Sequence, residues 1–281
     1  MRPAAPPVLD ADFTCRALVV ALAQTLADSG RTRFVVGLSG GVDSALAAAL
    51  AARAAGADAV TALFLPPPAT SPESGAAADR VAEQLGLALE TVPLGALLAA
   101  APLAAELDTS EGRARRGNLA ARLRMAILYD RAAATGALIV GTGNKSELAL
   151  GYTTLWGDMA ADCWPLGDLY KTQVLALARA LELPDEVLAR APSAELWEGQ
   201  TDESELGFSY SLADEVLYYY LDERRRPEEI IALGLAAELV GQVLDRVRAS
   251  AHKRRLPWVP KLSRRTIGHD FHHPRAWRGP A

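Results

Sequence analysis

RFVVGLSGGVDSALAAALAARAAG, residues 33–56, is the stretch that decides the fold. It predicts a short apolar strand over residues 33–38, a glycine-rich turn SGGVDS over 39–44, and an alanine-rich helix over 45–55 that ends at Gly56. Strands are expected again over residues 59–65, 87–94 and 137–142, with helices between them over 76–85 and 118–134. Apolar strands that alternate with helices predict an α/β fold, in which helices cover both faces of a parallel sheet.

The segments around this core are mainly helical. A helix is expected over residues 10–29, and further helices over 172–181, 185–190, 213–224, 227–233 and 236–249. Residues 71–74, the basic segment EGRARRGN at 111–118 and the polar segment 195–205 are expected as loops. We therefore expect one domain over residues 1–281, with the core sheet at about 30–175 and a helical region with a tail at about 176–281.

Composition excludes several classes of protein. The chain has 281 residues, 29 basic and 34 acidic residues, a net charge of −5 and 50% hydrophobic residues, which is typical of a globular protein rather than a disordered one. Its two cysteines, Cys15 and Cys163, cannot form a disulfide framework. No apolar run reaches the ~18–20 residues of a membrane span, and the N-terminus lacks a signal-like stretch. We expect a cytoplasmic protein without membrane or nucleic-acid partners.

The turn SGGVDS has the composition of an anion site. Adjacent glycines let backbone N–H groups converge on an oxyanion, and the following helix adds its dipole. The hydroxyl groups of Ser39 and Ser44 can donate further hydrogen bonds. The turn is not a Walker A motif, because no Gly-Lys pair occurs in the chain. Asp43 cannot bind phosphate directly, but it can do so through Mg²⁺.

A second polar constellation lies in GTGNKSELALGYTTLWGDMAADCWPLGDLYKTQV, residues 141–174. Thr142 and Glu147 follow the fourth strand, so they can face the first turn across the edge of the sheet. Glu147 and Asp43 supply two carboxylates for one Mg²⁺. Lys171 can neutralise phosphate charge, and Asp158 and Asp162 are further acids nearby.

These motifs carry a family resemblance. SGGVDS resembles the signature of the N-type ATP pyrophosphatases, which cleave ATP between its α- and β-phosphates. Residues 141–174, together with NLAARLRM at 118–125, PSAELWEGQTDESELGFSY at 192–210 and AHKRR at 251–255, closely resemble the NAD synthetase family. The resemblance covers roughly residues 12–275. It implies a Rossmann-like sheet of the adenine nucleotide alpha-hydrolase type.

The resemblance also implies roles for individual residues. Asp43 and Glu147 are implied as magnesium ligands, and Asp43, Lys171 and Asp162 as catalytic residues. The implied ATP contacts are Gly37, Leu38, Ser39, Gly40, Gly41, Val42, Asp43, Ser44, Thr142, Lys171 and Ser193. The implied contacts to nicotinic acid adenine dinucleotide (deamido-NAD) are Arg122, Asp162, His252 and Lys253.

The implied reaction has two steps. The nicotinate carboxylate attacks the α-phosphorus of ATP and forms an acyl-adenylate, with release of pyrophosphate; ammonia then attacks the acyl carbon, and AMP leaves. A carboxylate such as Asp158 or Asp162 can hold ammonium and help to deprotonate it. Only a few residues precede the synthetase-like region, so we expect ammonia to arrive free or from a separate glutaminase. The resemblance also implies a homodimer.

Two features depart from the family pattern. Leu155 stands where the ammonia-dependent branch carries lysine, as in the glutamine-dependent branch, and PPPATSPES replaces the usual second loop. Three alternatives stay open: an ATP pyrophosphatase with another substrate, such as a tRNA thiolase; a nucleotide-binding regulator; and the synthetase subunit of a larger amidotransferase. A thiolase predicts a CxxC pair, and a regulator predicts no second carboxylate.

Overall fold

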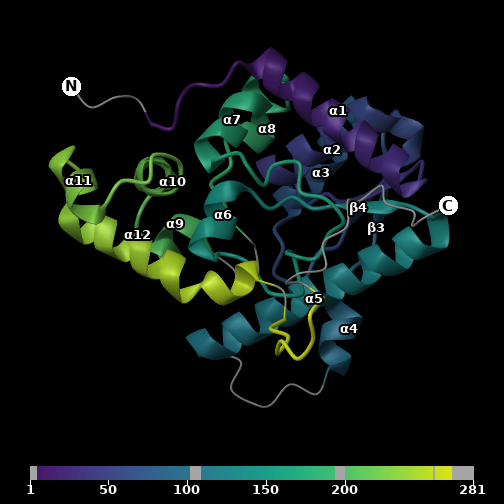
Figure 1. Ribbon diagram of the computed structural model, residues 1–281. Helices are drawn as coiled ribbons and strands as arrows, with labels where there is room; N and C mark the ends of the chain where they lie inside the picture. Colours follow the sequence, from purple (N-terminus) through teal and green to yellow (C-terminus); the bar gives the residue numbers. More distant parts are fainter. Residues whose placement is uncertain (1–4, 102–108, 194–199, 256, 268–281) are drawn as a thin grey trace.

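A four-stranded parallel sheet forms the centre of the computed structural model, which describes residues 5–101, 109–193, 200–255 and 257–267 (Figure 1). The strands are β1 (Phe34–Gly37), β2 (Val60–Phe64), β3 (Ala88–Thr91) and β4 (Leu138–Val140), in the order β3-β2-β1-β4. β1 pairs with both β2 and β4, so the first strand of the fold is central. The predicted parallel sheet is confirmed.

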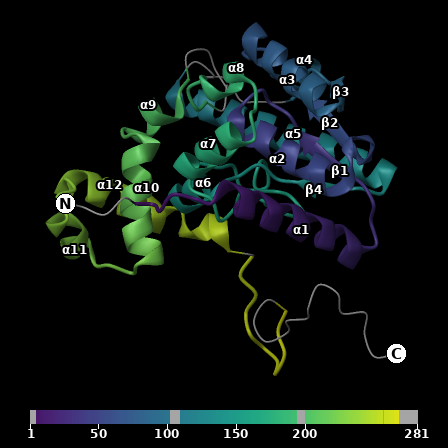
Figure 2. The ribbon, with the colours of Figure 1, turned by 90° about the horizontal axis from the view of Figure 1, so that it is seen from above.

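Helices cover both faces of the sheet, as its apolar strands require. Phe34 and Val36 pack into one core with α2 (Val42–Ala55), α3 (Pro72–Leu85) and α7 (Lys171–Ala180). On the other face, Val35 and Ile139 pack into a second core with the 26-residue α5 (Ser110–Thr135) and with α4 (Gly95–Ala100). The N-terminal α1 (Ala11–Ser29) lies against α2 (Figure 2).

The C-terminal part of the chain forms a helical layer beside the sheet (Figure 1). α6 (Lys145–Leu150) packs there against α10 (Tyr210–Leu217) and α12 (Ala237–Ala249) around a separate core that includes Tyr219, Ile230 and Leu244. The remaining elements are α8 (Asp185–Leu188), α9 (Asp202–Leu206), α11 (Pro227–Ala232), a π-helical turn η2 (Tyr218–Asp222), and the short 3₁₀ turns η1 (Ala57–Ala59) and η3 (Ala251–Arg254).

Several predicted element boundaries were wrong. The segment 111–118 is not a loop but the first two turns of α5, because Thr109 caps that helix by accepting a hydrogen bond from the amide of Gly112 (3.0 Å). The expected loop at 71–74 already contains the start of α3, with Pro72 in its first turn. α2 begins at Val42, directly after the glycines, rather than at residue 45.

The C-terminal half shows similar differences. The helix expected over 213–224 begins at Tyr210 and changes to the π-helical turn η2 after Leu217. Residues 202–205 of the polar segment belong to α9, which Thr201 caps; residues 195–199 of that segment lie outside the described residues. Within the described ranges, no helix is both long enough and apolar enough to cross a membrane.

Candidate active site

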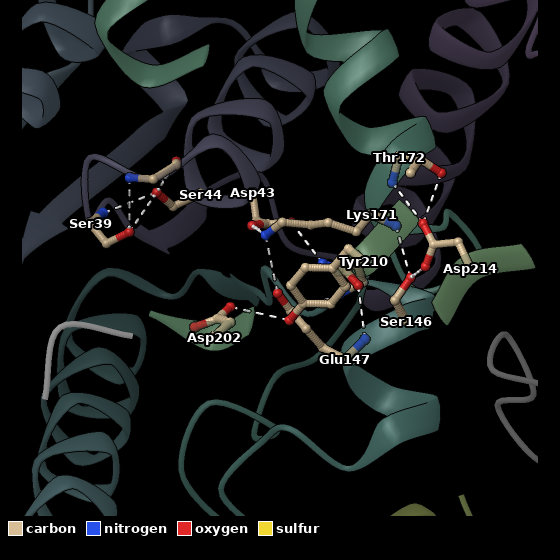
Figure 3. Close-up of polar contacts among 12 residues, drawn as sticks. Ser39, Asp43, Ser44, Ser146, Glu147, Lys171, Thr172, Asp202, Tyr210 and Asp214 are labelled. Atoms are coloured by element: carbon tan, nitrogen blue, oxygen red, sulfur yellow. Dashed lines mark hydrogen bonds and ion pairs between the residues drawn. The ribbon is translucent and has the colours of Figure 1, made fainter. Parts of the chain in front are cut away.

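The turn between β1 and α2 is closed by its own serine side chains (Figure 3). The amide of Ser39 donates to Ser44 Oγ (3.0 Å), the two hydroxyl oxygens lie 3.0 Å apart, and the amide of Gly41 donates to Ser39 Oγ (3.2 Å). Gly40 has a φ of +81°, and a Cβ added there would lie 2.4 Å from the carbonyl oxygen of Ser74 on α3. The turn is therefore a fixed backbone cradle at a helix N-terminus, which suits phosphate oxygens.

One lysine joins two carboxylates beside this turn. Lys171, the first residue of α7, places its ammonium group on Asp43 Oδ2 and 3.3 Å from Glu147 Oε1. The lysine side chain is only 3% exposed, and the two acids are 17% and 16% exposed. Asp43 comes from α2 and Glu147 from α6, so the carboxyl ends of β1 and β4 bring the three charges together, as predicted.

Asn144 is a member of this site that the sequence analysis missed. Its side-chain amide donates to Asp43 Oδ1 (2.8 Å), and its side-chain oxygen accepts from the amide of Glu147 (3.0 Å). The Glu147 carboxylate in turn accepts from the amide of Asn144 (3.3 Å). This is a capping box at the start of α6, and the spacing N-x-x-E in GTGNKSE is the signal that could have revealed it.

Burial and charge shift the pKa values of these groups. The pKa of Glu147 is raised to about 8, because burial and the negative charge of Asp43 raise it and the ammonium of Lys171 offsets them only in part. Burial alone lowers the pKa of Lys171, but the charges of Asp43 and Glu147 outweigh this and raise it above the ordinary value. The ammonium therefore stays charged, and the site is short of positive charge.

Two further buried acids support the lysine, and neither was predicted. Tyr210 turns its ring towards the ammonium of Lys171, 5.4 Å from the ring centroid, and donates its hydroxyl hydrogen to Asp202 Oδ2 (3.1 Å). Asp214 accepts from both the amide and the hydroxyl of Thr172 (2.9 and 2.8 Å) and from the hydroxyl of Ser146 (Figure 3). Asp214 thus fixes the start of α7 against α6.

Asp43, Glu147, Lys171 and Asp202 line one cavity of about 410 Å³, a size that suits a small-molecule ligand, whereas Asn144, Tyr210 and Asp214 lie behind its wall. It runs from the phosphate turn, past apolar side chains of β2 and α5, to the C-terminal layer. Of the predicted residues, its wall contains Gly37, Leu38, Ser39, Gly41, Val42, Asp43, Ser44, Thr142, Glu147, Asp158, Lys171, Ser193 and Lys253. Wall residues that were not predicted include Arg124, Tyr152, Arg190, Gln200, Asp202 and Glu205.

Three of the residues expected to contact deamido-NAD lie outside this wall. Arg122 is exposed on α5 and donates to the carbonyl oxygen of Leu155 (3.2 Å). Asp162 accepts from the amide of Ile139 (2.7 Å) at the end of β4, and His252 lies exposed 3.1 Å from the carbonyl oxygen of Ala249. The structure therefore does not bring these three residues together with the phosphate turn, and their roles stay predictions.

Lys253 and Asp158 do reach the cavity. Lys253 donates to the carbonyl oxygens of Gly151 and Thr153 (2.8 and 2.6 Å), so it also braces the segment after α6. Asp158 accepts from the amide of Thr154 and opens towards the cavity. Burial of this carboxylate raises its pKa to about 6.

The donor set fits a magnesium ion that arrives with phosphate. Asp43 and Glu147 both contact the ammonium of Lys171. The raised pKa of Glu147 shows that this ammonium does not fully balance the two carboxylates, so a bound cation would be stabilised there. Among the described residues, no three His, Cys, Asp or Glu side chains gather closely enough to cage a metal. Mg²⁺ is commonly held by one or two carboxylates plus substrate phosphates, so this limited set is sufficient.

Comparisons with known proteins show which family this chain resembles. A family model described as NAD synthase matches residues 14–257. An NH(3)-dependent NAD(+) synthetase from Chlorobaculum parvum is 47% identical over 244 residues, 87% of either chain. An NH3-dependent NAD synthetase from Campylobacter jejuni, solved with nitrate, has a TM-score of 0.74 and 30% identity over 90% of this chain and 100% of its own. An NMN synthetase from Francisella tularensis has a TM-score of 0.77 and 32% identity over the same shares.

Proposed function

The chain belongs to the NAD synthase family, and we propose that it converts deamido-NAD to NAD⁺ with ammonia as the nitrogen donor and ATP as the activating substrate. The observation that carries this proposal is the cluster of Asp43, Glu147 and Lys171 beside the phosphate turn. A phosphate cradle that faces two carboxylates and a buried ammonium is suited to adenylation of a carboxylate, rather than to transfer of the terminal phosphate by a Walker A lysine.

Each group has a distinct part in the first step. The N–H groups of residues 39–44 would hold the phosphate chain, with the dipole of α2 behind them. Asp43 and Glu147 would hold Mg²⁺, which supplies charge stabilisation to the phosphates when it is bound. Lys171 would then exchange part of its contact with the carboxylates for the phosphate oxygens, where negative charge grows during attack on the α-phosphorus.

The second step forms the amide bond. Ammonia attacks the acyl carbon of the adenylate, a C–N bond forms, AMP leaves with the electrons of the C–O bond, and the nitrogen gives up one proton to a nearby carboxylate or to solvent. This step needs neutral ammonia and a cavity wall that keeps water from competing for the acyl group. The cavity between the phosphate turn and the C-terminal layer provides such a wall.

Three properties around this activity are part of the proposal. We expect a homodimer, and Trp156, Trp164 and Tyr129, which are 50%, 40% and 39% exposed, are among the large apolar groups that a partner copy could cover. We expect the ammonia to arrive free or from a separate glutaminase. We also expect the enzyme to work in the cytoplasm, where ATP and dinucleotides are available.

Exchange of radiolabelled pyrophosphate into ATP tests the first step separately from the second. We expect exchange that requires both deamido-NAD and Mg²⁺ and is lost in Asp43→Ala, since that variant removes a carboxylate of the proposed magnesium site. Asp28→Ala is the matched control, because Asp28 is an acid at the far end of α1. Full exchange in folded Asp43→Ala would contradict the magnesium assignment.

A further inference from the structure

Arg190 places a positive charge in the cavity wall close to the start of α3. It follows α8 by two residues and is one of the residues that line the cavity. Its Nη2 donates to Ser74 Oγ (2.7 Å) and, at a longer distance, to Ser71 Oγ (3.5 Å). Ser74 is fully buried, and its hydroxyl oxygen lies 3.0 Å from that of Ser71. The two serines therefore hold one end of the guanidinium in a defined position.

Ser74 also connects Arg190 to the phosphate turn. The carbonyl group of Ser74 packs against Gly40, the second residue of the turn, so closely that an added Cβ would lie 2.4 Å from its oxygen. Lys171 reaches the same turn through Asp43, the fifth residue. The guanidinium thus approaches the start of the turn from α3, and the ammonium approaches its end from α7. Two cations therefore serve two different parts of a phosphate chain bound there.

Thr70, the residue before Ser71, adds a hydroxyl group to the same wall. Thr70 lines the cavity, and its buried hydroxyl oxygen has no hydrogen-bond partner among the described residues. A buried hydroxyl group without a partner is costly, so it indicates a partner that a ligand brings. The guanidinium of Arg190 can only donate, and its planar fork of N–H groups matches the oxygens of a phosphate group. A ligand that contacts both residues therefore carries anionic oxygen.

We propose that Arg190, with Thr70 beside it, binds the β- and γ-phosphates of ATP, the part that leaves as pyrophosphate. The inference rests on the proposed function and deepens it by naming the residue that stabilises the leaving group. During adenylation, the bond between the α-phosphorus and the bridging oxygen breaks, and its electron pair leaves with pyrophosphate. Arg190 keeps its proton at neutral pH, so it stabilises this charge as a fixed cation. Lys171 serves the α-phosphate.

Calorimetric titration of Arg190→Gln with ATP and with AMP, both in the presence of Mg²⁺, is the direct test. We expect the Kd for ATP to rise about 10- to 100-fold, the range expected from the loss of hydrogen bonds to a charged group. The Kd for AMP, which lacks the β- and γ-phosphates, should stay within about twofold of the wild type. Arg190→Lys keeps the charge but loses the fork, so its Kd for ATP should lie between the two. Arg179→Gln is the matched control that should change neither value, because Arg179 is exposed in the last turn of α7.

Thr70→Val decides the matter if Arg190→Gln does not fold. Valine keeps the shape of threonine and removes a hydroxyl group that has no partner in the free protein, so the variant should be at least as stable as the wild type in urea. Its Kd for ATP should nevertheless rise about 2- to 10-fold, the range expected from the loss of one neutral hydrogen bond. A residue with only a structural role would not weaken ATP binding in a fully stable protein.

The possible outcomes separate this proposal from the proposed function. An unchanged Kd for ATP in folded Arg190→Gln, or in Thr70→Val if the first variant does not fold, overturns the assignment of the pyrophosphate site. Equal losses of ATP and AMP affinity would place Arg190 at the α-phosphate or the nucleoside and also overturn it. A wild-type enzyme that makes no NAD⁺ refutes the proposed function, whereas the binding measurements decide the role of Arg190 in either case.

Discussion

At the scale of single residues, the site depends on one ammonium group that is shared by two acids. Lys171 is buried at a place where an isolated charge would be unstable. Its contacts with Asp43 and Glu147 offset the cost of removing the ammonium from water. The reverse also holds, because the two carboxylates would repel each other without the lysine. Lys171 and Asp43, which are 128 positions apart in the chain, therefore form one unit with Glu147 beside them.

Glu147 should make the stability of the metal-free protein depend on pH. Its pKa is about 8 in the folded state against an ordinary value of 4.5, so the folded state holds the proton more tightly. The stabilisation from this group is complete below about pH 4.5 and is lost as the pH rises through about 8. From about pH 5 to about pH 8, the unfolding free energy of the wild type should fall relative to Glu147→Gln, by up to about 1.4 kcal/mol per pH unit.

Urea unfolding of both proteins in buffer with a chelator measures this difference. The variant cannot titrate at that position, so its curve supplies the background from all other groups. A constant difference between the two proteins across the pH range would show that Glu147 is already ionised at low pH and would remove the argument for a shortage of positive charge.

At the scale of elements, the contact between the phosphate turn and α3 restricts one position to glycine. Gly40 and Gly56 both have positive φ angles, +81° and +87°, but only Gly40 has a backbone carbonyl where a Cβ would lie. Alanine should cost each variant about 1 kcal/mol or more through backbone strain. Only Gly40→Ala should also displace the turn and raise the Kd for ATP by tenfold or more, as calorimetry would show. Equal ATP affinities in the two variants would mean that the turn is not the phosphate site.

Asp214 holds three elements together beneath Lys171. It accepts hydrogen bonds from Ser146 on α6 and from the amide and hydroxyl of Thr172 on α7, and it is fully buried on α10. Asp214→Ala leaves these donors without an acceptor and should lower the unfolding free energy by about 2–4 kcal/mol. Asp214→Asn should lose less, since its carbonyl oxygen can still accept from Thr172. Denaturant unfolding distinguishes the two, and an alanine variant as stable as the wild type would show that the anchor is not required.

At the scale of the whole molecule, local sequence patterns predict the sheet and the residues at the centre of the site. They do not predict the buried residues that pack behind the site. Apolar strands, and glycines that end helices, predict the order of elements. The carboxyl ends of β1 and β4 bring Asp43 and Glu147 together. Asp202, Tyr210 and Asp214 meet the site only because the C-terminal layer folds back on α6 and α7. No hydrophobic periodicity or motif in residues 200–217 predicts that contact. The helix over 111–118 was missed for a related reason, since its glycines are buried rather than exposed as in a loop.

Leu155 is the position at which this chain departs from the ammonia-dependent pattern. Its side chain stands where the ammonia-dependent pattern carries lysine, yet the relatives at 41–47% identity are named NH(3)-dependent. The carbonyl oxygen of Leu155 is held by Arg122, so the main chain at this position is fixed.

The proposed activity can be measured as NAD⁺ formation from deamido-NAD, ATP and Mg²⁺, with ammonium in one reaction, glutamine in a second, and nicotinic acid mononucleotide in place of the dinucleotide in a third. We expect NAD⁺ with AMP and pyrophosphate in the ammonium reaction, and with glutamine alone no NAD⁺ and no more ATP cleavage than one adenylate per enzyme site. ADP and phosphate as products, or activity with the mononucleotide but not with the dinucleotide, would contradict it.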